Sequence, residues 1–322
     1  MRDKDTQIIN ETNAYVRNAI LAMAEPAYPE FTSKLVPTVD PATIAGVRTP
    51  NLKKFAKEFK KDPRCDVYMT SLPHTFLEEN VFHAFLINFE KDADRFYEQI
   101  EAFLPFVDNW MVSDTLRAPA ASKKPEVLLA KIRGWMASDR IYTQRVGVVL
   151  MMSYFLNENY RPEQALEVAK IKSDDYYLNM ARAWYFATAL AKQWESAVRF
   201  VEGDLLDEWT RLATIRKACE SFRVSDEHKE YLKSLKKAGA AARENVTNII
   251  EGEKKKVKIT ENPDKEIVKV IREGLRESGG YCPCRRERTP DTKCMCKEFR
   301  EQIKDPEFEG FCHCMLYYKS LE

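Results

Sequence analysis

Residues 141–156 read IYTQRVGVVLMMSYFL, and their apolar side chains recur at the spacing of a helix. Ile141, Val148, Val149 and Met152 fall on one face when successive residues are turned by about 100°. The same spacing occurs upstream in Phe82, Phe85, Leu86 and Phe89. The stretch therefore predicts an amphipathic helix that buries one face against its neighbours.

Helix-length segments of this kind fill most of the chain on both sides of that stretch. Residues 4–24 predict a first helix, followed by a proline-rich connection to about residue 48. Thr49 is a suitable N-cap, and Pro50 a suitable first residue, for the next helix. Further helices are predicted at 75–90, 93–106, 124–137, 141–156, 162–171, 175–193, 194–202, 207–221 and 226–237. Because strand-like alternation is nearly absent, we expect a mainly α fold in which antiparallel helices stack as an α-α superhelix, or solenoid.

The composition limits the cellular setting and the partners of the chain. Its 322 residues are 44% hydrophobic, which is enough to bury two separate cores. The net charge is +1, so a DNA-binding face would have to be local. No apolar run of about 18 residues is present, and the N-terminal MRDKDTQIINE lacks the apolar segment of a signal peptide. We therefore expect a soluble, cytoplasmic protein without a membrane span.

A change of composition at residues 236–260 marks the expected domain boundary. Its small and charged residues offer little to bury, which is typical of a linker. After it, Pro263 is the expected first residue of a helix that ends at Gly279-Gly280, and a short helix is expected at 295–304. The sequence thus predicts a helical domain over 1–237, a linker over 238–260 and a small α-helical domain over 261–322.

Six of the eight cysteines lie in this last domain as three Cys-x-Cys pairs, separated by nine and then fifteen residues. The pairs are Cys282/Cys284, Cys294/Cys296 and Cys312/Cys314. Four thiolates suffice to hold one [4Fe–4S] cluster, and the remaining two can exchange with a disulfide. Two alternatives stay open: a zinc site, although zinc ligands usually stand two to four residues apart, and a set of structural disulfides. Cys65 and Cys219 stand alone and are expected to be buried thiols.

The stretch 261–322 resembles the catalytic subunit of ferredoxin:thioredoxin reductase, a family that has Cys-Pro-Cys, Cys-Pro-Cys and Cys-His-Cys in this order. The resemblance implies that the [4Fe–4S] ligands are Cys282, Cys294, Cys296 and Cys312. It further implies that Cys284 and Cys314 form the redox dithiol. Cys284 would attack the disulfide of a thioredoxin-like protein, Cys314 would lie beside the cluster, and a ferredoxin-like protein would supply electrons one at a time.

Two residues of this motif, Met295 and His313, lie between the cysteines of a pair. His313 is expected to carry a proton to the leaving thiolate, because an imidazole can both accept and donate a proton near neutral pH. The alternative is that His313 only packs against the cluster. Met295 replaces the proline of the family's second pair, and the gaps between pairs also differ from those of the plant-type enzyme.

A second resemblance covers roughly residues 10–237. Four segments carry it: Gly46-Val47-Arg48-Thr49-Pro50, the stretch Asp108–Asp114, Arg145 in YTQR, and Trp184 in ARAWY. They resemble the DNA alkylation repair family of AlkD-type glycosylases, which are built from HEAT-like repeats. The resemblance implies that Trp110, Asp114 and Trp184 are catalytic and that Arg145 contacts DNA. The implied substrate is double-stranded DNA that contains N3- or N7-alkylated purines.

The chemistry of that reaction needs few groups. An alkylated purine is already cationic and leaves without a general acid, so one carboxylate, Asp114, can stabilise the positive charge that develops on the deoxyribose. The faces of Trp110 and Trp184 would favour the same charge. The alternative is structural: a packed ring, and a carboxylate that faces a helix dipole. Trp135, Trp194 and Trp209 are expected to lie in the core.

Six cations are candidates for contacts with DNA phosphates if they line one face of the helical domain. They are Arg48, Lys53, Lys54, Lys57, Arg145 and Arg182. A solvated helix face is the alternative for the lysines. Two other functions also stay open: a non-catalytic DNA- or protein-binding scaffold with a structural or redox-sensing cluster, and a helical domain that presents a protein disulfide to Cys284.

Overall fold

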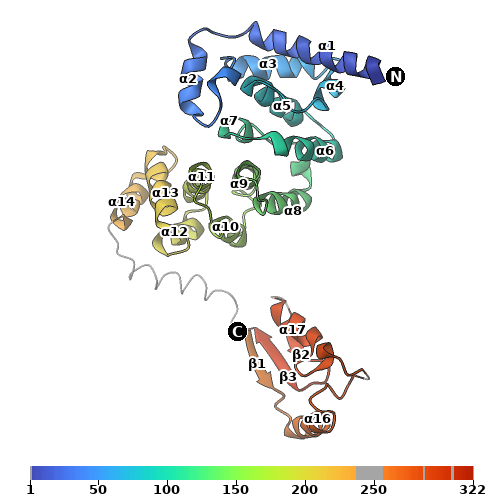
Figure 1. Ribbon diagram of the computed structural model, residues 1–322. Coiled ribbons are helices and arrows are strands. Elements are labelled where there is room, and N and C mark those ends of the chain that lie inside the picture. The colour runs from blue at the N-terminus through green and yellow to red at the C-terminus, as the bar shows by residue number, and fades with distance from the viewer. Residues whose placement is uncertain (1, 237–256, 286, 306–307, 322) are drawn as a thin grey trace. The chain divides into compact units, whose positions relative to one another are not determined.

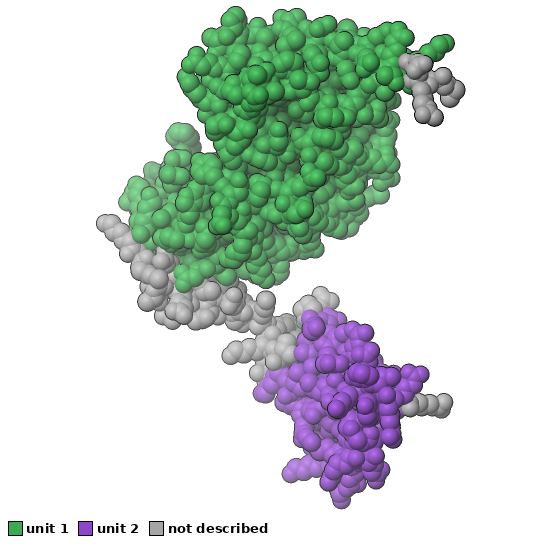
Figure 2. Space-filling view, viewed as in Figure 1, with its two compact units in different colours: residues 1–243 green, residues 244–322 purple. Residues whose placement is uncertain are grey.

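The computed structural model describes residues 2–236, 257–285, 287–305 and 308–321. The chain divides into two compact units, residues 1–243 (unit 1) and residues 244–322 (unit 2), which Figure 2 shows in green and purple. Most of the expected linker, residues 238–256, lies outside the described residues. Residues 257–260 belong to a strand of unit 2, so the expected start of that domain at 261 was too late.

Unit 1 is built from helices (Figure 1), as predicted. They are α1 (Arg2–Leu21), α2 (Tyr28–Leu35), α3 (Thr49–Phe59), α4 (Cys65–Met69), α5 (Leu77–Asn88), α6 (Ala93–Phe103), α7 (Trp110–Ser113), α8 (Pro125–Met136), α9 (Ile141–Tyr154), α10 (Pro162–Ala169), α11 (Tyr176–Lys192), α12 (Trp194–Glu202), α13 (Glu208–Glu220) and α14 (Asp226–Leu235). Helix α9 packs against both α7 and α11, and α11 packs against α13, as in a solenoid. None of the described helices is long and apolar enough to cross a membrane.

Three short helices of unit 1 were not predicted. Helix α2 lies within the proline-rich connection, because Pro29 falls in its first turn, where a proline costs no helical hydrogen bond. Helices α4 and α7 have only five and four residues, too few to show a periodic pattern. At α3 the N-cap is Arg48, and Thr49 is the first helical residue.

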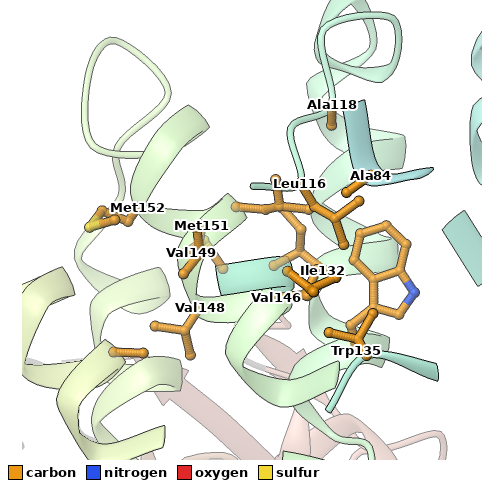
Figure 3. Packing of buried hydrophobic residues seen from close by; sticks show 14 of the residues in the cluster. Ala84, Leu116, Ala118, Ile132, Trp135, Val146, Val148, Val149, Met151 and Met152 are labelled. Atoms are coloured by element: carbon orange, nitrogen blue, oxygen red, sulfur yellow. The ribbon is translucent and has the colours of Figure 1, made fainter. Parts of the chain in front are cut away.

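The core of unit 1 is centred on α9, which is buried on nearly all sides. Val146, Val148 and Leu150 are fully buried, and Figure 3 shows the first two together with residues of α5 and α8, among them Trp135. Gly147 allows α8 to approach closely, because a Cβ at this position would lie only 2.6 Å from the side chain of Met136. The expected core position of Trp135 is thus confirmed.

The loop before α3 is held by a buried carboxylate. Glu78 of α5 accepts hydrogen bonds from the backbone N–H groups of Ala45, Gly46 and Val47, at 2.8, 2.7 and 3.2 Å. Gly46 has a φ of +84°, a conformation that favours glycine. Three consecutive N–H groups aimed at one anion form a nest, so Glu78 fixes the start of α3.

The part of unit 2 that the structure describes contains two α-helices and an antiparallel three-stranded sheet of order β1-β3-β2. The helices are α16 (Lys265–Glu277) and α17 (Lys297–Lys304), and the strands are β1 (Val257–Glu261), β2 (Gly310–Phe311) and β3 (Tyr317–Leu321). The expectation of an α-helical domain was therefore wrong. Strands of two to five residues are too short to show alternation, and β1 pairs with a strand far along the chain. Asp264 caps α16, so Pro263 lies before the helix.

Candidate functional sites

Trp110 is fixed at the start of α7 by two groups. Asn109, the N-cap of α7, accepts a hydrogen bond from the N–H of Val112. The indole Nε1 of Trp110 donates to the carbonyl oxygen of Leu35 at 2.9 Å, which ties α7 to the end of α2. The ring itself is half-buried against the core of unit 1. One edge of the indole is thus held in place while part of its surface remains accessible.

Asp114 ends α7 as its C-cap and forms a bidentate ion pair with Arg145 of α9. The guanidinium Nε and Nη2 lie 2.8 and 2.6 Å from the two carboxylate oxygens. The two side chains are only 14% and 5% exposed, so solvent screens the pair weakly. Arg145 Nη1 also donates to the carbonyl oxygen of Tyr177 in α11. One buried guanidinium thus joins three neighbouring helices and sets the orientation of the carboxylate.

Trp184, the third residue of the expected catalytic trio, lies on α11 and is half-buried against the core of unit 1. It stands seven residues beyond Tyr177, the point where Arg145 reaches this helix, or about 10 Å along the helix axis. The helices that carry the trio and Arg145 are consecutive neighbours, α7, α9 and α11.

Arg182 does not belong to a DNA-binding surface, which corrects the expectation. Its side chain is fully buried and donates to Asp207 at 2.9 Å and to Asn179 at 2.7 Å. Burial lowers the pKa of Arg182, and the nearby Asp207 carboxylate opposes that shift. The guanidinium of Arg145 is likewise buried, and it is hydrogen-bonded to Asp114 and to the carbonyl oxygen of Tyr177.

The remaining cations lie at the surface of α3. Lys53, Lys54 and Lys57 are exposed, and none forms an ion pair with another described residue. Arg48 is half-exposed, but it pairs with both oxygens of Glu25, at 2.7 and 2.9 Å, and lies over the ring of Tyr28. Among the six candidate cations, the three lysines are therefore the ones that carry no ion pair with a described carboxylate and can bind phosphates.

The sequence model of the DNA alkylation repair enzyme family matches residues 16–222, nearly the whole of the helical part of unit 1. The chain belongs to the DNA alkylation repair enzyme family. No curated protein matches the chain. Membership of this family agrees with the mainly helical fold of unit 1 and points to DNA as the substrate. The matched residues include the expected catalytic trio and its partner, Trp110, Asp114, Trp184 and Arg145.

Five of the six clustered cysteines of unit 2 line one narrow cavity. The residues around it are Cys282, Cys294, Met295, Cys296, Phe299, Cys312, His313, Cys314 and Tyr317. Backbone hydrogen bonds hold the first two pairs side by side: Cys282 N–H donates to Thr292 and Cys294 N–H to Gly280. Cys312 N–H donates to Tyr317 across the turn before β3. The fold thus gathers sulfurs from three separate segments.

The sixth cysteine has a different position. Cys284 is exposed and is not among the residues that line the cavity, whereas Cys314 is buried within it. The Sγ atoms of Cys312 and Cys314 are 3.6 Å apart. The pairing of Cys284 with Cys314 remains a prediction. His313 is exposed and also lines the cavity, so it can reach both solvent and the sulfurs.

Three of the cysteine thiols have a raised pKa because they are partly buried and lie near other thiols. Burial is the largest cause that raises the pKa of Cys284, Cys294 and Cys314, and neighbouring cysteines add to it. For Cys294 these neighbours are Cys282, Cys312 and Cys296, which line the same cavity. A bound cation would reverse these shifts, since it stabilises thiolates.

Among the residues that the structure describes, no three His, Cys, Asp or Glu side chains are placed to hold a single metal ion. The ligands of one zinc ion converge on a point. The ligands of a [4Fe–4S] cluster each bind a different iron, so their sulfurs stand further apart. The donor set at the cavity consists of soft thiolates, which suit iron–sulfur clusters.

Proposed function

We propose that unit 1 binds double-stranded DNA and hydrolyses the N-glycosidic bond of N3- or N7-alkylated purines. The observation that supports this most strongly is the bidentate Arg145–Asp114 pair beside Trp110, in a chain of the DNA alkylation repair enzyme family. An enzyme of this kind needs a carboxylate that is ionised, oriented and partly shielded from water.

The Asp114 carboxylate would act on the deoxyribose. As the bond to the cationic base breaks, positive charge develops on the sugar, and a fixed anion stabilises that charge. Each carboxylate oxygen can accept more than one hydrogen bond, so pairing with Arg145 leaves Asp114 able to orient a water. The rings of Trp110 and Trp184 would pack against the sugar and favour its charge. Lys53, Lys54 and Lys57 would bind phosphates.

Base release from DNA that contains 7-methylguanine tests this proposal. We expect the wild type to release the base and Asp114→Asn to bind the DNA but release none. Asp108→Asn is the matched control, because Asp108 is an exposed carboxylate of the same segment. A wild type that releases no alkylated base would leave unit 1 as a non-catalytic DNA-binding scaffold.

We further propose that Cys282, Cys294, Cys296 and Cys312 hold a [4Fe–4S] cluster. The cavity that these cysteines share, lined on one side by Phe299 and Tyr317, supports the proposal. When bound, such a cluster exchanges single electrons with a donor, here a ferredoxin-like protein. Exposed Cys284 would attack the disulfide of a thioredoxin-like partner and form a mixed disulfide with it. Cys314 would then attack this mixed disulfide and release the partner as a dithiol, and His313 would protonate the leaving thiolate.

Iron and sulfide content after anaerobic purification tests the cluster. We expect about four irons per chain in the wild type and loss of iron in Cys294→Ser. Cys219→Ser is the control, since Cys219 belongs to unit 1. A protein that carries zinc and no iron would contradict the proposal.

A further inference from the structure

Aromatic residues stand at the first turns of four successive neighbouring helices of unit 1. Trp110 is the first residue of α7, Tyr142 the second of α9, Tyr176 and Tyr177 the first two of α11, and Trp209 the second of α13. Because α7, α9, α11 and α13 pack in this order, the aromatic side chains follow one edge of the stack. We call these five residues the aromatic row.

Four rings of the row, those of Tyr142, Tyr177, Tyr176 and Trp209, contact one another in sequence. The ring centroids of Tyr142 and Tyr177 are 6.3 Å apart, those of Tyr177 and Tyr176 are 5.2 Å apart, and those of Tyr176 and Trp209 are 5.6 Å apart. All of these distances lie in the range of interacting aromatic pairs. Tyr176 is 55% exposed and Trp209 is 42% exposed, so the expectation that Trp209 lies in the core was wrong. The far end of the row thus presents two adjacent rings to solvent.

The row is continuous with the site around Asp114. Arg145 joins the Asp114 carboxylate to the carbonyl oxygen of Tyr177, and Tyr142 lies one turn before Arg145 on α9. A ligand that occupies the Asp114 site would therefore meet Tyr176 and Trp209 if it extended along the starts of α11 and α13. In this family that ligand is DNA.

The local charge determines which part of DNA fits. Asp175 and Asp207 cap α11 and α13, and Glu208 adjoins Trp209. Asp207 is paired with Arg182 and Glu208 with Arg211, and both guanidinium groups are buried, so neither cation is exposed to bind a phosphate. The faces of unpaired bases carry no charge and stack on aromatic rings. We propose that Tyr176 and Trp209 form a stacking site for unpaired bases of the DNA strand beside the lesion. This inference rests on the proposed function, because it assumes that DNA occupies the Asp114 site.

The test compares two labelled duplexes, one fully paired and one with a two-nucleotide bulge, by fluorescence anisotropy in the Asp114→Asn background. Catalysis is absent there, so the stacking site is measured separately from base release. We expect Trp209→Ala and Tyr176→Ala each to weaken binding of the bulged duplex about tenfold, within the range for one stacked base. Binding of the paired duplex should change less than about twofold, and Trp209→Phe should restore most of the loss. The slope of affinity against salt should not change, because no phosphate contact is removed.

Phe222→Ala is the matched control. Phe222 is a fully exposed aromatic residue that follows the opposite end of α13 from Trp209, and its removal should leave both affinities unchanged. Equal affinities of Trp209→Ala and wild type for the bulged duplex would overturn the inference. So would an equal loss on both duplexes with a reduced salt slope, or a self-association of the wild type that Trp209→Ala abolishes. Failure of the wild type to release alkylated bases, with the bulge-specific loss intact, would refute only the proposed catalysis.

Discussion

Arg145 and Asp114 meet in two nearly parallel hydrogen bonds at the junction of α7, α9 and α11. Arg145→Lys keeps the charge but not the fork that orients the carboxylate. We expect base release to slow about a hundredfold under single-turnover conditions, with DNA affinity nearly unchanged.

Arg133→Lys is the control for that variant, because Arg133 makes a bidentate pair with Glu167 at the exposed surface. It should behave as wild type. Arg145→Ala is less informative, since it leaves Asp114 unpaired in a largely buried position and should cost about 3 kcal/mol of folding free energy. If Arg145→Lys releases base at the wild-type rate, the orientation of Asp114 by Arg145 is unimportant.

Glu78→Gln should destabilise unit 1 by about 2–4 kcal/mol. An amide offers only one accepting oxygen to the three N–H groups of residues 45–47 and directs its own N–H groups at the other donors. Urea unfolding followed by tryptophan fluorescence measures this, because all five tryptophans belong to unit 1. Glu58 is exposed on α3, so Glu58→Gln should shift the urea midpoint little. Equal urea midpoints for Glu78→Gln and Glu58→Gln would show that Glu78 does not hold the loop.

Mild acid should destabilise unit 1 through a buried histidine pair. His74 Nε2 and His83 Nδ1 are 2.8 Å apart. Burial lowers the pKa of His74 to about 4 and that of His83 well below its usual value. The unfolded chain binds protons on these residues below about pH 6.5, whereas the folded chain resists them. Stability is therefore complete above about pH 6.5 and falls as the pH decreases towards 4, by about 3 kcal/mol for His74.

Urea midpoints at several pH values between about 7 and 5 check this. Glu90, whose pKa is lowered to about 2, contributes only below about pH 4.5 and does not interfere. His74→Gln should flatten the dependence. A wild type that is equally stable at both ends of that range would contradict the expectation.

The lysines of α3 should contribute most of the salt-dependent affinity for DNA. Each phosphate contact adds about 0.9 to the slope of log affinity against log salt, so the triple change of Lys53, Lys54 and Lys57 to Ala should reduce it by about 2–3. Lys131→Ala is the control, because Lys131 is already paired with Glu101 at 2.6 Å. If the triple variant keeps the wild-type slope, DNA does not lie along α3.

The long helices of unit 1 were predictable because their apolar faces repeat over several turns. Helix α9 was expected at 141–156 and spans Ile141–Tyr154. Helices α2 and α7 and the strands of unit 2 escaped prediction, because they are short and depend on contacts made elsewhere: Leu35 binds Trp110, and β1 pairs with β3.

Residue type alone did not predict which side chains are exposed. Arg182 and Lys53 look alike as cations in the sequence, yet one is buried beside Asp207 and the other is exposed. That difference depends on a partner 25 residues away in the chain, which periodicity cannot reveal. Trp209 was likewise misassigned, because an aromatic residue at a helix start can face either way. The contact of Arg145 with a backbone carbonyl left no signal in the sequence.

The pairing of β1 with β3 brings Val257 opposite Leu321, so the first and last described residues of unit 2 lie side by side. A fragment cut after Cys314 would keep all six sulfurs but lose the strand that closes the sheet. A fragment that is used to study unit 2 alone must therefore include both β1 and β3. Ends that lie side by side also allow such a unit to be inserted into a surface loop of another protein, because the two ends of the loop are themselves close together.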